Sequence, residues 1–171
     1  MARSANTATM NTVKEPEELS VWSHCGWTMT VDPRLRGELC DDLRTLRLFH
    51  EACELSLSSN RFDRTDGGPA HAEDILGWFP PPNLVGDRFA HDDGEHVGRA
   101  VWITVPGETS PGTWLLVALT LHRASLRGAQ MTFVFGRAEA RDEALAVWRS
   151  VRYDPDEGAR TAGVTPSPRR L

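Results

Sequence analysis

Apolar and polar residues alternate in the first third of the chain in a way that predicts strands. Residues 27–31 (WTMTV) have the two-residue period of a half-buried strand, which Asp32-Pro33 ends. A second apolar run contains Leu46 and Leu48, and residues 53–58 again alternate apolar with polar. The two runs are close enough in sequence to predict a hairpin that turns around residues 50–52.

The middle of the chain changes from a helical period to three strand-like segments. Residues 72–79 place apolar side chains at i, i+3, i+4 and i+7, which predicts a short helix ended by the prolines at 80–82. We expect a polar loop over 83–96, followed by strands at 99–105, 113–122 and 130–135. Residues 115–121 are apolar at nearly every position, which is typical of a strand covered on both faces, so we expect this strand at the middle of the sheet.

One apolar stripe near the C-terminus gives the clearest helical pattern. It consists of Ala140, Ala144, Val147, Trp148 and Val151. The element order predicts an α+β fold: a single domain with an antiparallel sheet of about six strands backed by helices. We assign this domain to residues 21–153. Residues 1–20 and 154–171 are poor in large apolar residues, so we expect flexible tails there.

Three segments together resemble the Mog1/PsbP-like group: residues 26–31 (GWTMTV), 54–59 (ELSLSS) and 142–151 (DEALAVWRSV). In that group a Trp-bearing strand opens the sheet and a terminal helix packs on it. The resemblance covers about residues 21–153 and implies an α/β/α sandwich. It also implies a binding or accessory role, since members include a regulator of a small GTPase, photosystem subunits and bacterial lipoproteins. The chain lacks the signal peptide and lipoprotein cysteine of the exported bacterial members, so we do not expect an envelope role.

Charge and composition exclude several classes of partner. The net charge is −5 and Lys/Arg residues form no run, which argues against binding of nucleic acid. No stretch is apolar and long enough to cross a membrane, and the three cysteines match neither a disulfide framework nor a zinc-knuckle spacing. Only Lys14 among 19 basic residues is a lysine, a usage typical of GC-rich genomes such as those of actinobacteria. We therefore expect a bacterial, cytoplasmic protein with free thiols and no cofactor.

The densest cluster of polar groups is residues 91–96 (HDDGEH). Imidazole and carboxylate groups bind divalent ions, which makes His91, Asp93 and His96 candidate metal ligands. A small metal-assisted hydrolase or ligand-binding domain could use these residues, with His122 arriving from the central strand. The alternative is a solvated acidic turn, because charged residues are ordinary in turns.

Two thiols lie near imidazoles in the sequence. Cys25 follows His24, and Cys53 follows His50 by three residues. A neighbouring imidazolium can activate a thiolate nucleophile. The alternative for Cys53 is a small buried hydrophobe, since it shares the strand face of Leu55.

The aromatic segment after the first helix is the candidate partner-binding site. Trp78 and Phe79 precede three prolines, and Phe89 follows, so a rigid apolar segment could project from the domain. The alternative places these side chains in the core, because their spacing is helical.

The leading hypothesis is a non-enzymatic binding or accessory protein that acts through a protein partner. A specific version is an immunity or chaperone-like protein for a toxin or secreted effector, because an acidic domain suits a basic partner. The rivals are the metal or ligand site at 91–96 and a structural subunit that self-associates through its strand edges into a homo-oligomer.

Overall fold

The structure is a computed structural model, and it describes residues 19–42, 44–51, 53–62, 71–106, 112–160 and 168–170. Of the predicted N-terminal tail, only Leu19 and Ser20 are among them, and Ser20 already begins a strand. No helix within the described ranges is long and apolar enough to cross a membrane.

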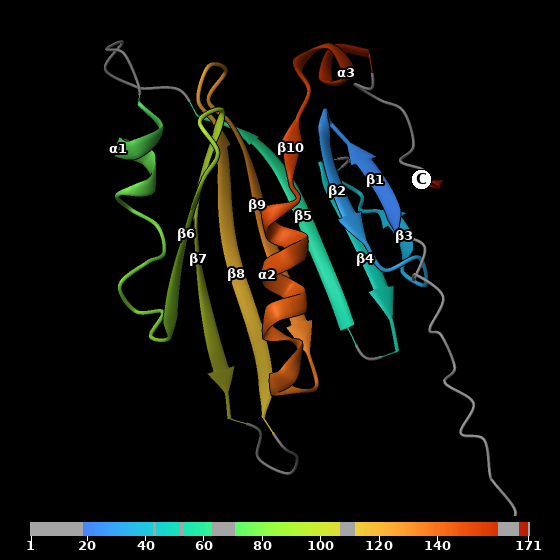
Figure 1. Cartoon of the computed structure of the whole chain (residues 1–171), viewed down its shortest axis with the longest axis vertical. Helices are drawn as coiled ribbons and strands as arrows, with labels where there is room; N and C mark the ends of the chain where they lie inside the picture. The colour runs from blue at the N-terminus through green and yellow to red at the C-terminus, as the bar shows by residue number, and fades with distance from the viewer. Residues whose placement is uncertain are drawn as a thin grey trace, which may run out of the picture.

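A seven-stranded antiparallel sheet spans the width of the molecule (Figure 1). Its strand order is β3-β4-β5-β9-β8-β7-β6. The strands are β3 (Arg36–Leu39), β4 (Thr45–His50), β5 (Cys53–Arg61), β6 (Asp87–Asp92), β7 (His96–Val105), β8 (Thr113–His122) and β9 (Arg127–Phe135). The predicted hairpin is formed by β4 and β5, in which Leu46 pairs with Leu57 and Leu48 with Leu55.

Strand β8 is covered on both faces, as its apolar run predicted. Leu116 belongs to the main core on one face, whereas Leu119 and Leu121 belong to a second cluster on the other. The strand lies between β7 and β9, so the central position of the seven belongs to β9.

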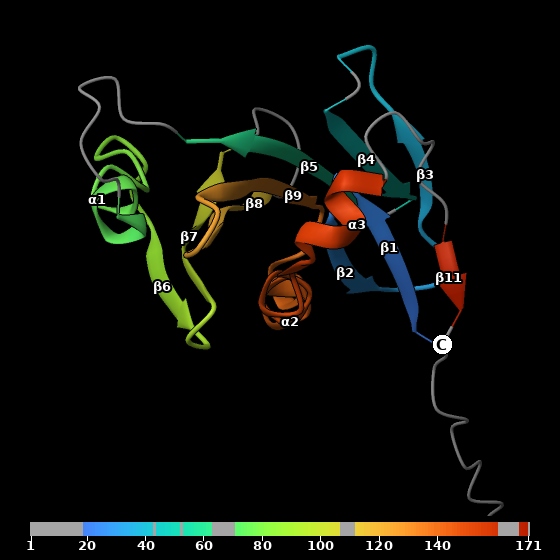
Figure 2. The same ribbon diagram turned by 90° about the horizontal axis from the view of Figure 1, so that it is seen from above.

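The main core lies between the large sheet and a layer made of α2 and a smaller sheet (Figure 2). This smaller sheet has the order β10-β2-β1-β11, with β1 (Ser20–His24), β2 (Trp27–Val31), β10 (Arg152–Tyr153) and β11 (Pro168–Arg170). Helix α2 (Arg141–Arg149) follows the 3-10 turn η1 (Ala138–Ala140). Its Trp148 is fully buried and donates its indole N–H to Thr120 Oγ1 of β8 at 2.9 Å. This hydrogen bond fixes α2 against the sheet.

The opposite face of the large sheet carries helix α1 (Ala72–Leu76). Ala72 and Leu76 pack with Leu119 and Leu121 of β8 in the second cluster. The two faces together confirm the α+β class with helices packed on a largely antiparallel sheet.

Several elements differ from the sequence prediction. The expected polar loop at 83–96 contains the edge strand β6, and β1 precedes the first predicted strand. Within 154–171, which we expected to be a flexible tail, the chain forms helix α3 (Pro155–Arg160) and β11. Strand β1 was not predicted because two of its inward-facing residues, Ser20 and His24, are polar, so the sequence shows no alternation of apolar and polar residues there.

Candidate functional site

The segment 77–86 connects α1 to β6 and is fixed to the domain at several points. The Trp78 N–H donates to the Ile75 carbonyl at 3.2 Å, and the Phe79 N–H donates to the Leu76 carbonyl at 3.1 Å. Pro80 is buried, and Phe79 packs against the second cluster. The segment is therefore held in one conformation by backbone bonds and by its own apolar anchors.

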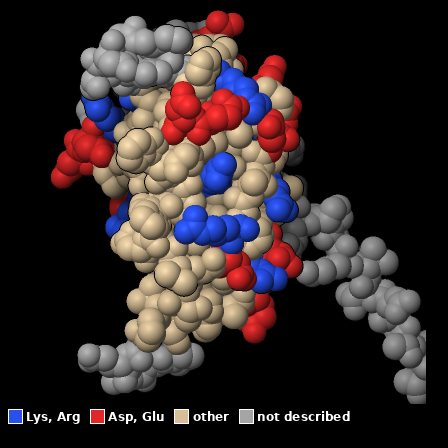
Figure 3. Space-filling view, turned by 90° about the vertical axis from the view of Figure 1, so that its left-hand side faces the viewer, with Lys and Arg blue, Asp and Glu red and all other residues tan. Residues whose placement is uncertain are grey.

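Two large hydrophobic side chains of this segment face solvent. Trp78 is 84% exposed and Val85 is 85% exposed, and no other large hydrophobic residue in the described ranges exceeds half exposure. Figure 3 shows this side of the molecule, where a continuous uncharged area in the lower part is bordered by acidic and basic side chains. We call Trp78 and Val85 with their supporting segment 77–86 the Trp78 surface.

The other two predicted partner-binding residues lie elsewhere. Phe79 is half-buried in the cluster under α1, and Phe89 is half-buried on β6, where it packs against the main core. Of the three predicted partner-binding residues, only Trp78 is exposed, whereas Phe79 and Phe89 pack against the hydrophobic clusters of the domain. Sequence reasoning missed Val85, whose exposure no periodicity indicates.

An ionic network ties α1 to β6. The Arg123 guanidinium donates to Asp92 Oδ1 at 2.8 Å and to Glu73 Oε1 of α1 at 2.8 Å. The hydrogen bond from Arg123, together with one from the Gly94 N–H, holds the pKa of the Asp92 carboxyl well below its usual range. The network helps to keep the start of the Trp78 surface in place.

The predicted metal ligands come together around one carboxylate. Asp93 Oδ2 lies 3.7 Å from His91 Nε2, and its Oδ1 lies 3.3 Å from His96 Nδ1. His96 Nε2, however, accepts the backbone N–H of Tyr153 at 2.9 Å, and the Arg152 guanidinium lies 3.2 Å from Asp93. In the described part of the chain, no group of three or more His, Cys, Asp or Glu side chains is arranged to hold a metal ion. Metal binding at these residues stays a prediction.

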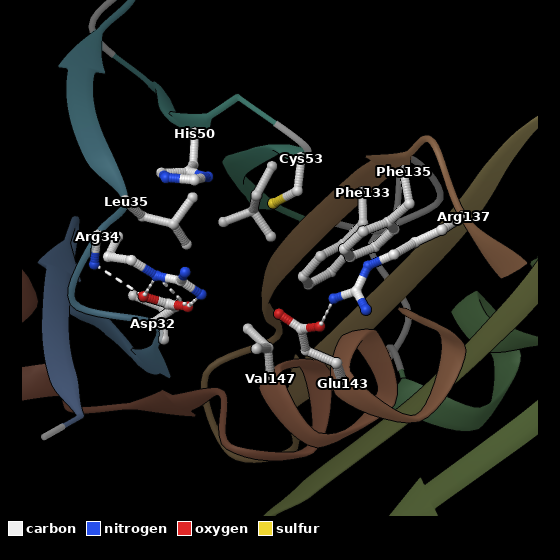
Figure 4. A pocket seen from close by; sticks show the side chains of 12 residues that line it. Asp32, Arg34, Leu35, His50, Cys53, Phe133, Phe135, Arg137, Glu143 and Val147 are labelled. Carbon is white, nitrogen blue, oxygen red and sulfur yellow. Dashed lines mark hydrogen bonds and ion pairs between the residues drawn. The ribbon is translucent and has the colours of Figure 1, made fainter. Parts of the chain in front are cut away.

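A small pocket opens between α2, β2 and the β4–β5 hairpin (Figure 4). Its volume is about 60 Å³, and its wall includes Phe133, Phe135 and Leu55. The mouth carries two ion pairs, Asp32 with Arg34 and Arg137 with Glu143, which Figure 4 shows on opposite sides. Sequence reasoning did not identify this pocket, because its residues come from distant segments.

Neither candidate thiol has the environment of a nucleophile. Cys53 lines the pocket, where burial, together with the charges of Glu143 and Asp32, raises its pKa to about 11. Burial also raises the pKa of Cys25 and lowers that of His24, although the thiol lies 3.4 Å from His24 Nε2. Both shifts oppose a thiolate–imidazolium pair, so the buried surroundings of these thiols favour a structural role.

Comparisons with known proteins identify the fold. No protein-family model matches the chain, and no curated protein matches it. A crystal structure of a protein from Bacteroides thetaiotaomicron VPI-5482 is similar, with a TM-score of 0.56 and 10% identity over 83% of this chain and 50% of that one. This chain therefore spans about half the length of that protein.

Two further solved structures are similar. PsbP (CyanoP) from Synechocystis sp. PCC 6803 has a TM-score of 0.51 and 10% identity, over 86% of this chain and 98% of that one. The Ran-binding protein Mog1p of Saccharomyces cerevisiae has a TM-score of 0.46 and 9% identity, over 82% of this chain and 98% of its own. The chain has a Mog1/PsbP-like fold, as the sequence resemblance implied.

Proposed function

We propose that this chain is a non-enzymatic binding protein that holds a protein partner at the Trp78 surface. The observation that carries the proposal is the exposure of Trp78, at 84%, on a segment whose neighbouring side chains are anchored in the core. Exposed aromatic side chains on preorganised segments are the usual anchors of protein interfaces, because they bury a large area with little loss of conformational entropy.

Neither Cys25 nor Cys53 lies in surroundings that activate a nucleophile, which agrees with this role. Cys53 and Cys25 both have raised pKa values, and His96 is committed to a backbone hydrogen bond. The proposed partner is a protein, since an aromatic anchor flanked by a broad uncharged area matches the apolar centre and polar rim of such interfaces.

The finer version of the proposal is an immunity or chaperone-like protein of the bacterial cytoplasm that binds a toxin or secreted effector. The net charge of −5 supports a role in steering an oppositely charged partner over long range. This version requires a saturable complex that does not depend on the histidines of residues 91–96.

The test is co-purification from the native cell with wild type, Trp78→Ala and the control Phe49→Ala. Phe49 is an aromatic residue on β4, at the opposite end of the large sheet from β6, and is 36% exposed. We expect Trp78→Ala to leave the free energy of unfolding within about 0.5 kcal/mol of wild type, because the side chain is exposed. It should weaken partner binding by about 2 kcal/mol or more, as the loss of a central aromatic anchor does.

A partner that wild type and Phe49→Ala retain and that Trp78→Ala loses would support the proposal. Equal retention by all three proteins would contradict it.

A further inference from the structure

Two arginines beside the Trp78 surface have no acidic partner. Arg88 of β6 and Arg99 of β7 are both exposed, and neither makes a hydrogen bond or an ion pair among the described residues. Some other exposed arginines are paired, as Arg47 is with two glutamates and Arg137 is with Glu143. Arg36 and Arg149, on other parts of the surface, also have no such partner among the described residues.

The register of the sheet places both guanidiniums on one face. Arg88 pairs across the strands with Val101, and Ala90 pairs with Arg99, so the two arginines are diagonal neighbours. Such neighbours are about 7–8 Å apart at their Cα atoms. The residues between them, including Phe89, point into the main core on the other face. The two positive charges are therefore close together and directed away from the core.

This is also the face that carries the Trp78 surface. Arg99 lies two residues after Val97, which packs in the cluster under α1 together with Phe79. Arg88 follows Val85 by three residues, so their Cα atoms are at most about 10 Å apart. Figure 3 shows basic side chains in the middle of this face, next to the uncharged area.

We infer that the Trp78 surface binds an acidic protein segment, in which one or two large apolar residues contact Trp78 and Val85 while carboxylates pair with Arg88 and Arg99. This inference rests on the proposed function. An exposed guanidinium binds a carboxylate through two parallel hydrogen bonds, which gives the pairing both energy and direction.

The proposed preference for an acidic segment depends on the charges next to the Trp78 surface and not on the net charge of the whole chain, which is −5. Interactions between exposed charges are screened beyond about 8–10 Å at physiological salt, so a bound segment senses mainly the groups it contacts. Glu73 and Asp92 at the α1 end both pair with Arg123, which leaves that cluster with one net negative charge. Arg88 and Arg99 are positive charges beside the Trp78 surface that no acidic side chain among the described residues pairs with, so they are available to a bound carboxylate.

A nucleic acid strand is the competing polyanion, because its bases could stack on Trp78. Binding of that kind needs a longer track of positive charge along the phosphate backbone. The exposed Asp74 of α1, and Glu73 and Asp92, which share a single arginine, oppose such a track. We therefore assign the surface to a peptide segment and keep the oligonucleotide as an outcome of the test.

The experiment selects peptides from a random 12-residue phage library on the immobilised full chain, with counter-selection on the Trp78→Ala variant. The expected peptides are net acidic and carry one or two large apolar residues. Synthetic copies are then titrated against wild type, Arg88→Ser/Arg99→Ser and the control Arg36→Ser/Arg149→Ser. The control removes the same charge from exposed positions on β3 and α2, away from α1 (Figure 1).

We expect Arg88→Ser/Arg99→Ser to weaken the selected peptides about tenfold at low salt, and the control double variant to leave their affinity unchanged. Added salt should reduce the difference. Selected peptides that depend on Trp78 but are neutral or basic would overturn the inference and leave the proposed function standing. Displacement of the peptides by oligo(dT) at equal charge concentration would also overturn it. A library that yields no Trp78-dependent peptide would count against the proposed function, and the inference would fall with it.

Discussion

A hydrogen bond between Tyr153 of β10 and the buried His96 imidazole couples the charge of that imidazole to the position of β10. The residue is 2% exposed, and its Nε2 accepts the Tyr153 N–H at 2.9 Å. Tyr153 and Arg152 form β10, which pairs with Trp27 and Thr28 of β2. A protonated Nε2 carries its own hydrogen and cannot accept this bond, so protonation and the observed position of β10 are incompatible.

The sign of the pH effect follows from the pKa of His96. Burial lowers this pKa from its ordinary 6.5, the nearby His122 and Arg152 act in the same direction, and Asp93 opposes them. The unfolded chain therefore binds the proton more readily than the folded chain. The stabilisation by neutral His96 is complete above pH 6.5 and is lost as the pH falls from 6.5 through the folded pKa.

The size of this pH effect is limited because a single group, His96, takes up the proton. Between the two pKa values the free energy of unfolding falls by up to about 1.4 kcal/mol for each pH unit. In the protonated state the Tyr153 N–H also loses its acceptor, which costs about 1–3 kcal/mol if it stays buried.

The assay compares wild type with His96→Gln, which keeps a side-chain acceptor but does not titrate. Urea unfolding followed by tryptophan fluorescence at pH 8, 7, 6 and 5 gives the free energy of unfolding for each protein. Buried His24 also has a lowered pKa, but it is present in both proteins, so the difference between their slopes isolates His96. We expect wild type to lose more stability than His96→Gln between pH 7 and pH 5. Equal losses would show that protonation of His96 does not destabilise the fold.

Three further predictions concern the core and the pocket. Thr120→Val leaves the buried Trp148 N–H without its acceptor and should lower the free energy of unfolding by about 1–3 kcal/mol, measured by urea titration; an unchanged value would show that the bond does not hold α2. Leu116→Ala removes a fully buried side chain from the main core and should cost about 2–5 kcal/mol in the same assay, whereas a cost below about 1 kcal/mol would contradict the packing described. Cys53, with its pKa raised to about 11, should react with iodoacetamide at pH 8 about a hundredfold more slowly than a free thiol of pKa ~8.5, followed by mass spectrometry; a rate equal to that of the free thiol would contradict it.

The sequence predicted best those elements whose burial follows a simple period. The stripe containing Ala144 and Trp148 became the buried face of α2, and the hairpin of β4 and β5 has the predicted turn. Strand β6 was missed because most of its exposed positions are charged and its inward residues are Phe89 and His91, which form no apolar run. Its formation depends on pairing with β7, a tertiary contact that local pattern does not contain.

The candidate site was only partly predictable for the same reason. Trp78 and Phe79 are adjacent and both fit a helical spacing, yet one is exposed and the other packs under α1. Exposure is decided by the path that the segment 77–86 takes from α1 to the edge strand β6. Likewise, the two arginines without acidic partners could be recognised only from the register between β6 and β7.

The most direct test of the central claim is site-specific photo-crosslinking in the native cell. A photoreactive phenylalanine analogue is placed at position 78 in one protein and at position 49 in the control. We expect position 78 to yield one defined cross-linked protein partner, which position 49 does not yield. No cross-link at position 78, the same product from both positions, or a product that contains only a second copy of this chain would contradict it.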